Sequence, residues 1–250
     1  MKFLIPSYMR ADKQRTLREL LRLGVDKDDI FIGVQTRSDF DIYKNCADGF
    51  ENIVYNPAHN LSGNYNNLLE EFRDHDVVAL MDDDIRAIGY VREGGKGGKA
   101  TPEQFRACIE SMGDVVLSGR ASICTAWTST NAVFAERARK AHGDIARGFI
   151  SSGWLMVVDP RRIRFDESLS ACEDYDVQLR ELNHGRDVYR CNRIYPYTPS
   201  RLEKNGEQSG GRGFFYEDEE NIRQFKEIER RYFPLARFDG TSIRLNRRYI

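Results

Sequence analysis

Three consecutive aspartates, Asp82, Asp83 and Asp84, directly follow the apolar run at residues 77–81. Such a run, without polar alternation, is typical of a parallel strand that helices cover on both faces. Open α/β sheets bind ligands at the carboxyl ends of these strands. Because strand side chains alternate, we expect Asp82 and Asp84 on one side and Asp83 on the other. Two carboxylates on one side suit magnesium or manganese bridged to substrate phosphates, although a solvated aspartate-rich turn is the alternative.

A second acidic group begins the predicted helix at residues 173–184. Glu173, Asp174 and Asp176 fall in its first turn, where exposed amides and the helix dipole favour carboxylates. Asp176 and Arg180 have the spacing of an i,i+4 ion pair. Taken alone, these residues indicate ordinary helix-terminal chemistry, although a carboxylate here could also serve as a general base.

The elements that must position these residues form an alternating series. Short apolar runs alternate with longer amphipathic stretches, which favours an α/β fold with a mainly parallel sheet flanked by helices. A chain of 250 residues, 40% of them hydrophobic, can form one domain over residues 1–250. The predicted strands are residues 2–6, 30–35, 52–55, 76–81, 122–127, 150–158 and 188–192. The predicted helices are residues 11–23, 62–72, 102–117, 173–184 and 217–232, with a basic tail up to residue 250.

Capping and glycine patterns refine these boundaries. Ser62 is predicted near the cap of its helix and Thr101 as the cap of the next, with Pro102 at the first helical position. Residues 94–99 are predicted as a hairpin or loop tip, and the glycine-rich residues 199–213 as a mobile loop.

Four segments, in order along the chain, resemble the GT-A glycosyltransferases. They are Ile-Pro-Ser-Tyr-Met-Arg at residues 5–10, Gly-Asn-Tyr-Asn-Asn at 63–67, Met-Asp-Asp-Asp-Ile at 81–85, and Cys-Glu-Asp-Tyr-Asp at 172–176. They are similar to that family's nucleotide loop, nucleotide-side helix start, DxD metal motif and acceptor-side ED motif. The resemblance spans about residues 2–197. More narrowly, the chain resembles the phage-type TET-associated glycosyltransferases, which glycosylate oxidised-methyl pyrimidines in DNA.

The resemblance implies a GT-A domain that transfers a sugar from a nucleotide-sugar, a UDP-sugar first, with Mn²⁺ or Mg²⁺ as cofactor. Asp84 would be the direct metal ligand, Asp82 would face the ribose or the cation, and Asp83 would support them. A cation there stabilises the departing diphosphate. Asp174 would be the general base and Glu173 would orient the acceptor, with inversion at the anomeric carbon.

Further residues are candidates for binding the nucleotide-sugar, although each could instead be an ordinary turn, strand-end or helix-start residue. The full set is Pro6, Ser7, Tyr8, Arg10, Gln35, Thr36, Gly63, Asn64, Asn67, Asp82 and Asp83. Many GT-A enzymes supply a later histidine to the cation, but residues 193–199 contain none. His184 precedes Gly185 at a predicted helix end, where a favourable cation–dipole contact is the simpler interpretation. The shell would then be completed by phosphates and water.

The acceptor is specified less well by the residues. A net charge of −1 gives no electrostatic argument for binding to nucleic acid or to a membrane. The acceptor, a hydroxymethylated pyrimidine in DNA such as 5-hydroxymethylcytosine, is implied by the resemblance alone. The candidate acceptor contacts are Trp154, Arg201, Lys204 and Arg212. Alternatives are a glycan or small-molecule acceptor, a nucleotidyltransferase, and a non-catalytic DNA-binding protein.

Composition also bears on the compartment. The five cysteines form no CxxC pair, which favours reduced thiols. Neither a secretory signal nor an apolar segment of the roughly 20 residues of a membrane span is evident. We therefore expect a soluble cytoplasmic protein without membrane association, located in an infected bacterial host if phage-encoded.

Overall fold

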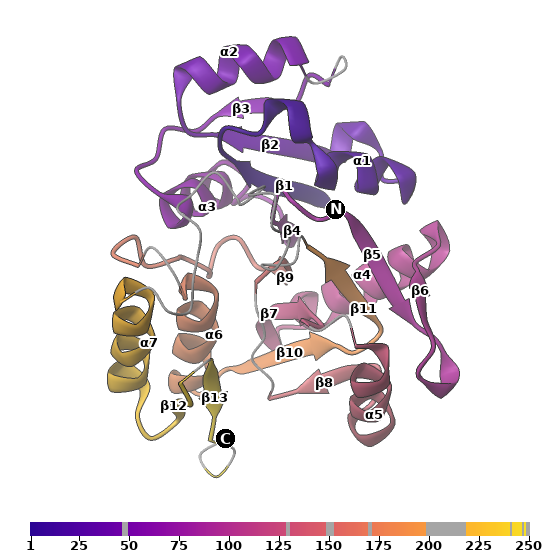
Figure 1. Cartoon of the computed structure of the whole chain (residues 1–250), viewed down its shortest axis with the longest axis vertical. Helices are drawn as coiled ribbons and strands as arrows, with labels where there is room; N and C mark the ends of the chain where they lie inside the picture. The colour runs from indigo at the N-terminus through magenta and orange to yellow at the C-terminus, as the bar shows by residue number, and fades with distance from the viewer. Residues whose placement is uncertain are drawn as a thin grey trace.

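A central sheet organises the computed structural model, which describes residues 1–46, 50–128, 131–148, 153–169, 172–198, 219–240, 242–246 and 248. The sheet has eight strands in the order β3-β2-β1-β4-β9-β7-β10-β8 (Figure 1). Their bounds are β1 (Lys2–Ser7), β2 (Ile30–Val34), β3 (Ile53–Tyr55), β4 (Val78–Met81), β7 (Ala121–Ala126), β8 (Ile145–Arg147), β9 (Leu155–Val158) and β10 (Asp187–Cys191).

Most of these strands run in one direction. The pairs β1–β2, β1–β4, β2–β3 and β7–β10 are parallel. Strand β9 lies antiparallel between β4 and β7, and β8 is antiparallel to β10 at the edge. The expected mainly parallel α/β sheet is therefore confirmed.

Helices cover both faces of the sheet. Their bounds are α1 (Arg15–Arg22), α2 (Arg37–Cys46), α3 (Leu61–Glu71), α4 (Pro102–Leu117), α5 (Ala132–His142), α6 (Glu173–Asn183) and α7 (Glu219–Tyr232). Side chains of α1, α2 and α4 pack with Phe3 and Met81 on one face, while α3 and α6 pack with Leu4 and Leu80 on the other. Adjacent strand residues are thus buried on opposite faces, which explains the apolar run before the aspartates. None of the helices in the described ranges is long and apolar enough to cross a membrane.

Two smaller sheets flank the central one. Strands β5 (Ala87–Val91), β6 (Gly97–Lys99) and β11 (Ile194–Tyr197) form an antiparallel sheet in the order β11-β5-β6. Gly89 is required there, because a Cβ atom at this position would lie 2.3 Å from the Tyr195 ring. Strands β12 (Ala236–Phe238) and β13 (Ile243–Leu245) form a hairpin beside α6 and α7, which lie next to each other (Figure 1).

Several predicted boundaries need correction. The helix expected at residues 11–23 is divided into a 3-10 turn, η1 (Ala11–Lys13), and α1. The cap of α3 is Asn60, whose Oδ1 accepts from the Gly63 amide at 2.9 Å, and Ser62 lies inside the helix. Thr101 does cap α4, in a reciprocal capping box with Gln104.

Other predictions hold in part or fall outside the described residues. The segment at residues 94–99 lies in a hairpin, in which the 3-10 turn η3 (Glu93–Gly95) connects β5 to Gly97–Lys99. A further 3-10 turn, η2 (Lys27–Asp29), precedes β2. Of the strand expected over residues 150–158, Leu155–Val158 form β9, residues 153–154 form a turn, and residues 150–152 lie outside the described residues. The loop expected at residues 199–213 lies outside the described residues.

Candidate functional site

The three aspartates lie at the carboxyl end of β4, in a turn. Thr16 of α1 holds this turn, because its hydroxyl donates to the Asp82 carbonyl at 2.5 Å and accepts from the Ile85 amide at 3.0 Å. The Asp82 amide donates to the Trp154 carbonyl at 3.1 Å. The main chain on both sides of the turn is therefore fixed, and the expected position at the sheet edge is confirmed.

Each aspartate side chain has different partners. Asp82 accepts from the Tyr65 hydroxyl at 2.9 Å. Asp83 accepts from Ser7 Oγ at 2.6 Å and from Arg10 Nη1 at 2.5 Å. The same Arg10 nitrogen lies 3.6 Å from Asp84 Oδ2. Because the residues form a turn, the strict alternation expected of a strand is not observed: Arg10 contacts Asp83 and Asp84.

Burial places these carboxylates in an unfavourable environment for negative charge. It raises the pKa of Asp83 to about 6, with the Arg10 charge and the Ser7 hydrogen bond opposing the shift. Burial and then the Asp84 charge raise the pKa of Asp82 well above its ordinary value, and burial also raises the pKa of Asp84, opposed by Arg10. The charge of Arg15 also lowers the pKa of Asp84. Three carboxylates thus face two arginine charges, and the remaining negative charge suits a hard divalent cation.

The ligand geometry indicates how such a cation would be held. In the described parts of the chain, no three His, Cys, Asp or Glu side chains form a ready-made metal site. Asp83 is ion-paired with the Arg10 guanidinium at 2.5 Å, so Asp82 and Asp84 are the better candidates to hold a cation. Magnesium and manganese are commonly held by one or two carboxylates together with substrate phosphates and water.

The second acidic pair lies at the start of α6. Cys172, which precedes the helix, has a left-handed backbone with φ of 63°. Asp174 accepts from the Gly153 amide through Oδ2 and from the Tyr175 amide through Oδ1, both at 2.8 Å. Burial, followed by the Asp174 charge, raises the pKa of Glu173 to about 8, and burial also raises the pKa of Asp174. This pair is therefore poised to hold or accept a proton near neutral pH.

Asp176, two residues further on, has a different environment. It is 1% exposed and accepts from the Tyr232 hydroxyl at 2.8 Å. Arg231 and Arg180 lie 3.4 Å and 3.8 Å from its carboxylate. Asp176 thus joins α6 to α7 through buried polar contacts.

The acidic turn and the start of α6 both contact the two residues that precede β9, Gly153 and Trp154. The Trp154 carbonyl accepts from Asp82, and the neighbouring Gly153 amide donates to Asp174. A Cβ atom on Gly153 would lie 2.8 Å from Asp174 Cβ, so the absence of a side chain permits this approach. The charges of Asp82, Glu173 and Asp174 all raise the pKa of Tyr65, after burial. The two acidic groups therefore belong to one site.

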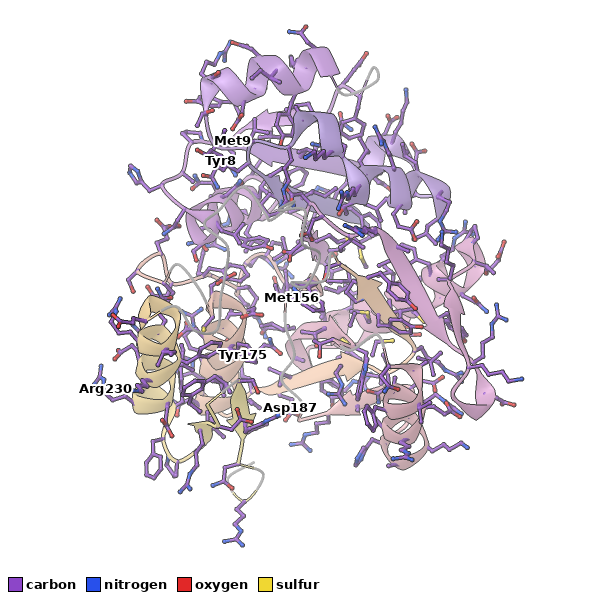
Figure 2. The ribbon with its side chains drawn as sticks, viewed as in Figure 1. Tyr8, Met9, Met156, Tyr175, Asp187 and Arg230 are labelled. Atoms are coloured by element: carbon purple, nitrogen blue, oxygen red, sulfur yellow. The ribbon has the colours of Figure 1, made fainter. Side chains whose placement is uncertain are left out.

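The residues after β1 contribute to the same site. Ser7 and Arg10 are buried and directed to Asp83, whereas Tyr8 is 37% exposed. Met9 has a left-handed backbone with φ of 53°, which turns the chain between them. In the view of Figure 2, Tyr8 and Met9 lie on the β1 side of the molecule and Tyr175 on the α6 side, with Met156 of β9 between them. Pro6 lies inside β1, paired with Gly33.

Other candidate nucleotide residues have local partners. Asn64 is fully buried, and its side-chain amide donates to the Gly33 carbonyl at 3.1 Å. Asn64 therefore joins α3 to β2, and we no longer assign it as a nucleotide contact. Asn67 is exposed and donates to the Pro57 carbonyl at 2.8 Å. The hydroxyl of exposed Thr36 accepts from the Asp39 amide at 3.0 Å in the first turn of α2. Gln35 is half-buried at the end of β2.

The acceptor candidates are only partly described. Trp154 is half-buried, and its main-chain carbonyl accepts from the Asp82 amide. Arg201, Lys204 and Arg212 lie outside the described residues. His184 follows α6 and is exposed, with its Nδ1 3.1 Å from Arg186 Nη2.

Three residues that position the site were absent from the sequence-based assignments. Thr16 and Tyr43 are fully buried, and Tyr65 is 2% exposed. Tyr65 lies in the segment resembling the family's nucleotide-side helix, which was a usable signal. Thr16 contacts Asp82, and Tyr43 contacts Ser7 and Arg10, from helices distant in sequence, a relation that no local pattern reveals.

Comparisons with known proteins identify the fold. No protein-family model and no curated protein matches this sequence. The mannosyltransferase PcManGT from Pyrobaculum calidifontis, solved with GDP-Man and Mn²⁺, is 12% identical with a TM-score of 0.51, covering 80% of this chain and 57% of that one. GalNAc-T7, solved with UDP, GalNAc and Mn²⁺, is 10% identical with a TM-score of 0.54, covering 81% and 44%.

The chain thus spans about half the length of these two proteins. At such low identity the similarity concerns the fold. This chain has the GT-A-like fold of nucleotide-diphospho-sugar transferases, a mixed α/β sheet flanked by helices.

Proposed function

We propose that this protein is a metal-dependent glycosyltransferase that uses a nucleotide-sugar donor, with a UDP-sugar as the first candidate. The observation that carries the proposal is the convergence of two half-buried acidic groups, Asp82–Asp84 and Glu173–Asp174, on one edge of a GT-A-like sheet. Transfer from a nucleoside diphosphate sugar requires charge stabilisation at the leaving group and a base at the acceptor. The two acidic groups supply one function each.

On the donor side, Asp84 and Asp82 would hold Mn²⁺ or Mg²⁺, whose charge stabilises a departing diphosphate. Asp83 fixes Arg10 beside them at 2.5 Å. The exposed Tyr8 and the half-buried Gln35, at the ends of β1 and β2, are the proposed nucleotide contacts. Pro6, Thr36, Gly63 and Asn67 would shape the chain around them.

On the acceptor side, Asp174 is the proposed base. The Gly153 and Tyr175 amides orient its carboxylate, and one lone pair on each oxygen remains for an acceptor hydroxyl. The hydroxyl proton passes to Asp174 while its oxygen forms a bond to the anomeric carbon. The bond from that carbon to the diphosphate breaks, and its electron pair leaves with the diphosphate. In-line attack inverts the anomeric carbon, and Glu173 orients the acceptor.

A donor-hydrolysis screen tests this proposal. UDP-, GDP- and ADP-sugars are incubated with the protein, with and without Mn²⁺, and the released nucleotide is identified. We expect nucleoside diphosphate only with metal, and a loss on the order of a hundredfold or more in Asp84→Asn. Asp187→Asn is the matched control, because Asp187 is the first residue of β10 and pairs with Arg147, whereas the acidic turn follows the last residue of β4. Metal-independent release, unchanged in Asp84→Asn, would refute the donor site, and pyrophosphate release would indicate nucleotidyl transfer.

For the acceptor, we propose a hydroxymethylated pyrimidine in DNA, supported by the family resemblance of the motifs. The target base would have to be turned out of the helix for its hydroxyl to reach half-buried Asp174. Trp154, Arg201, Lys204 and Arg212 are the proposed contacts. Such an acceptor corresponds to a cytoplasmic enzyme, within an infected bacterial host if phage-encoded.

Labelled donor sugar with matched DNAs tests this acceptor. One duplex contains 5-hydroxymethylcytosine, a second contains cytosine, and a glycan mixture is tested in parallel. Label on the first duplex alone supports the assignment. Label on glycans without any on modified DNA rejects the DNA acceptor and leaves the donor chemistry intact.

A further inference from the structure

We propose that Tyr43 of α2 is a positioning residue for the cation site: acting through Ser7, its hydroxyl fixes Asp83, and Asp83 in turn keeps Arg10 from pairing fully with Asp84. This inference rests on the proposed function, because it concerns the same carboxylates. It adds a residue from a helix that carries none of the site's motifs.

The contacts form a closed ring. The Arg10 amide donates to Tyr43 Oη at 2.8 Å, and Tyr43 Oη lies 2.8 Å from Ser7 Oγ. Ser7 Oγ donates to Asp83 Oδ2 at 2.6 Å, and Arg10 Nη1 donates to Asp83 Oδ1 at 2.5 Å. The ring therefore begins and ends at Arg10, once through its main chain and once through its guanidinium.

The direction of each hydrogen bond follows from donor counting. A serine hydroxyl has one hydrogen, and the Ser7 hydrogen goes to the Asp83 carboxylate. Tyr43 must therefore donate to Ser7, while its oxygen accepts the Arg10 N–H. Burial raises the pKa of Tyr43 to about 12, so the phenol keeps this proton at neutral pH. Phenylalanine at this position would leave the Arg10 N–H and the Ser7 oxygen without these partners.

The ring matters for the cation because Arg10 is shared. Arg10 Nη1 lies 2.5 Å from Asp83 but 3.6 Å from Asp84. An Asp83 carboxylate that is no longer held by Ser7 can rotate and release the guanidinium toward Asp84. Arg10 would then compete with a cation for the same carboxylate oxygen. Tyr43 thus maintains the separation that leaves Asp84 available.

The placement of Tyr43 agrees with this role. It is fully buried, at 0% exposed, and belongs to the core on the face that α1 also covers. A buried hydroxyl without partners is costly, so a tyrosine in this core is stabilised only where its oxygen meets polar groups. Helix α2 packs against η1, the turn that directly follows Arg10, and so delivers that hydroxyl to the ring.

The test is a titration of the whole protein with Mn²⁺ alone, in which the electron paramagnetic resonance of free Mn²⁺ reports binding. Four proteins are compared: wild type, Tyr43→Phe, Ser7→Ala, and the double variant. We expect about a tenfold weaker Mn²⁺ affinity in each single variant, as is usual for residues that orient metal ligands. The double variant should resemble the single variants, because both substitutions interrupt one relay.

Tyr232→Phe is the matched control. Tyr232 is also buried and donates to a carboxylate, Asp176, at 2.8 Å, but it joins α6 to α7. We expect Tyr232→Phe to lose stability and to keep the Mn²⁺ affinity of the wild type. Circular dichroism establishes folding, and if Tyr43→Phe does not fold, Ser7→Ala decides the outcome.

The two hypotheses fail in different ways. Wild-type affinity in folded Tyr43→Phe, or in folded Ser7→Ala, overturns the positioning role and leaves the metal-dependent function standing. Equal losses of affinity in Tyr43→Phe and Tyr232→Phe also overturn it, because the effect would then be general destabilisation. A wild-type protein that does not bind Mn²⁺ refutes the proposed cation site and this inference together.

Discussion

Thr16→Val removes the hydroxyl that holds the acidic turn while keeping the side-chain shape. Thr16 is fully buried, and its hydroxyl satisfies the Asp82 carbonyl and the Ile85 amide. Valine would leave both main-chain groups unpaired, at about 1–3 kcal/mol each. We therefore expect a loss of ~2–6 kcal/mol in the free energy of unfolding, which corresponds to roughly 4–24 °C in Tm for a chain of this size.

Urea denaturation followed by circular dichroism measures this change, and Thr16→Ser is the control. Serine keeps the hydroxyl and loses one methyl group, for about 1 kcal/mol. We also expect weaker Mn²⁺ binding in Thr16→Val and unchanged binding in Thr16→Ser. If Thr16→Val is as stable as Thr16→Ser, the hydroxyl does not support the turn and the reasoning is wrong.

Three further predictions follow from the packing and charge of the site. Gly33→Ala would place a Cβ atom 2.8 Å from both Asn64 Oδ1 and Leu68 Cδ1, and should cost about 1–3 kcal/mol in urea denaturation; an unchanged midpoint would contradict this packing. Gly153→Ala would place a Cβ atom 2.8 Å from Asp174 Cβ and displace that carboxylate. We expect kcat, measured as sugar transfer with saturating donor, to fall by more than about tenfold. An unchanged kcat would contradict a catalytic role for Asp174. The pKa of Glu173 in the folded protein is about 8, above its ordinary value of 4.5. Protonated Glu173 therefore contributes fully to the free energy of unfolding below pH 4.5, and this contribution is lost as the pH rises through about 8. The free energy of unfolding should therefore fall more steeply with pH in wild type than in Glu173→Gln, by on the order of a few kcal/mol in total, and parallel pH curves would contradict the shift.

The sequence predicted best where one segment determines its own structure. The apolar run before Asp82 predicted a strand buried on both faces, and Thr101 with Pro102 predicted the start of α4. Both patterns depend on neighbouring residues. Placing the aspartates at the carboxyl edge required only the general topology of parallel sheets.

The prediction was poorer where partners come from elsewhere in the chain. Helix α2 was not expected, because few of its apolar residues face inward. Among its described side chains, Tyr43 is the one that is fully buried. Asn64 was expected to bind the nucleotide, yet its partners are the main chain of β2 and Asn56. The roles of Arg10 and Asp83 emerge only from their mutual distance, which depends on how β1 and β4 pair.

The Gly153–Trp154 dipeptide has a consequence for evolution of the site. The Gly153 amide donates to the Asp174 carboxylate, and the Trp154 carbonyl accepts from the Asp82 main-chain amide, so the spacing between Asp174 and the acidic turn is set through main-chain groups, which are common to almost all amino acids. For the proposed glycosyltransferase, substitutions in the surrounding side chains can therefore change which sugars and acceptors bind while the distance between the two acidic groups stays constant. Insertions or deletions next to this unit would change that distance, and we expect natural variation to be concentrated elsewhere.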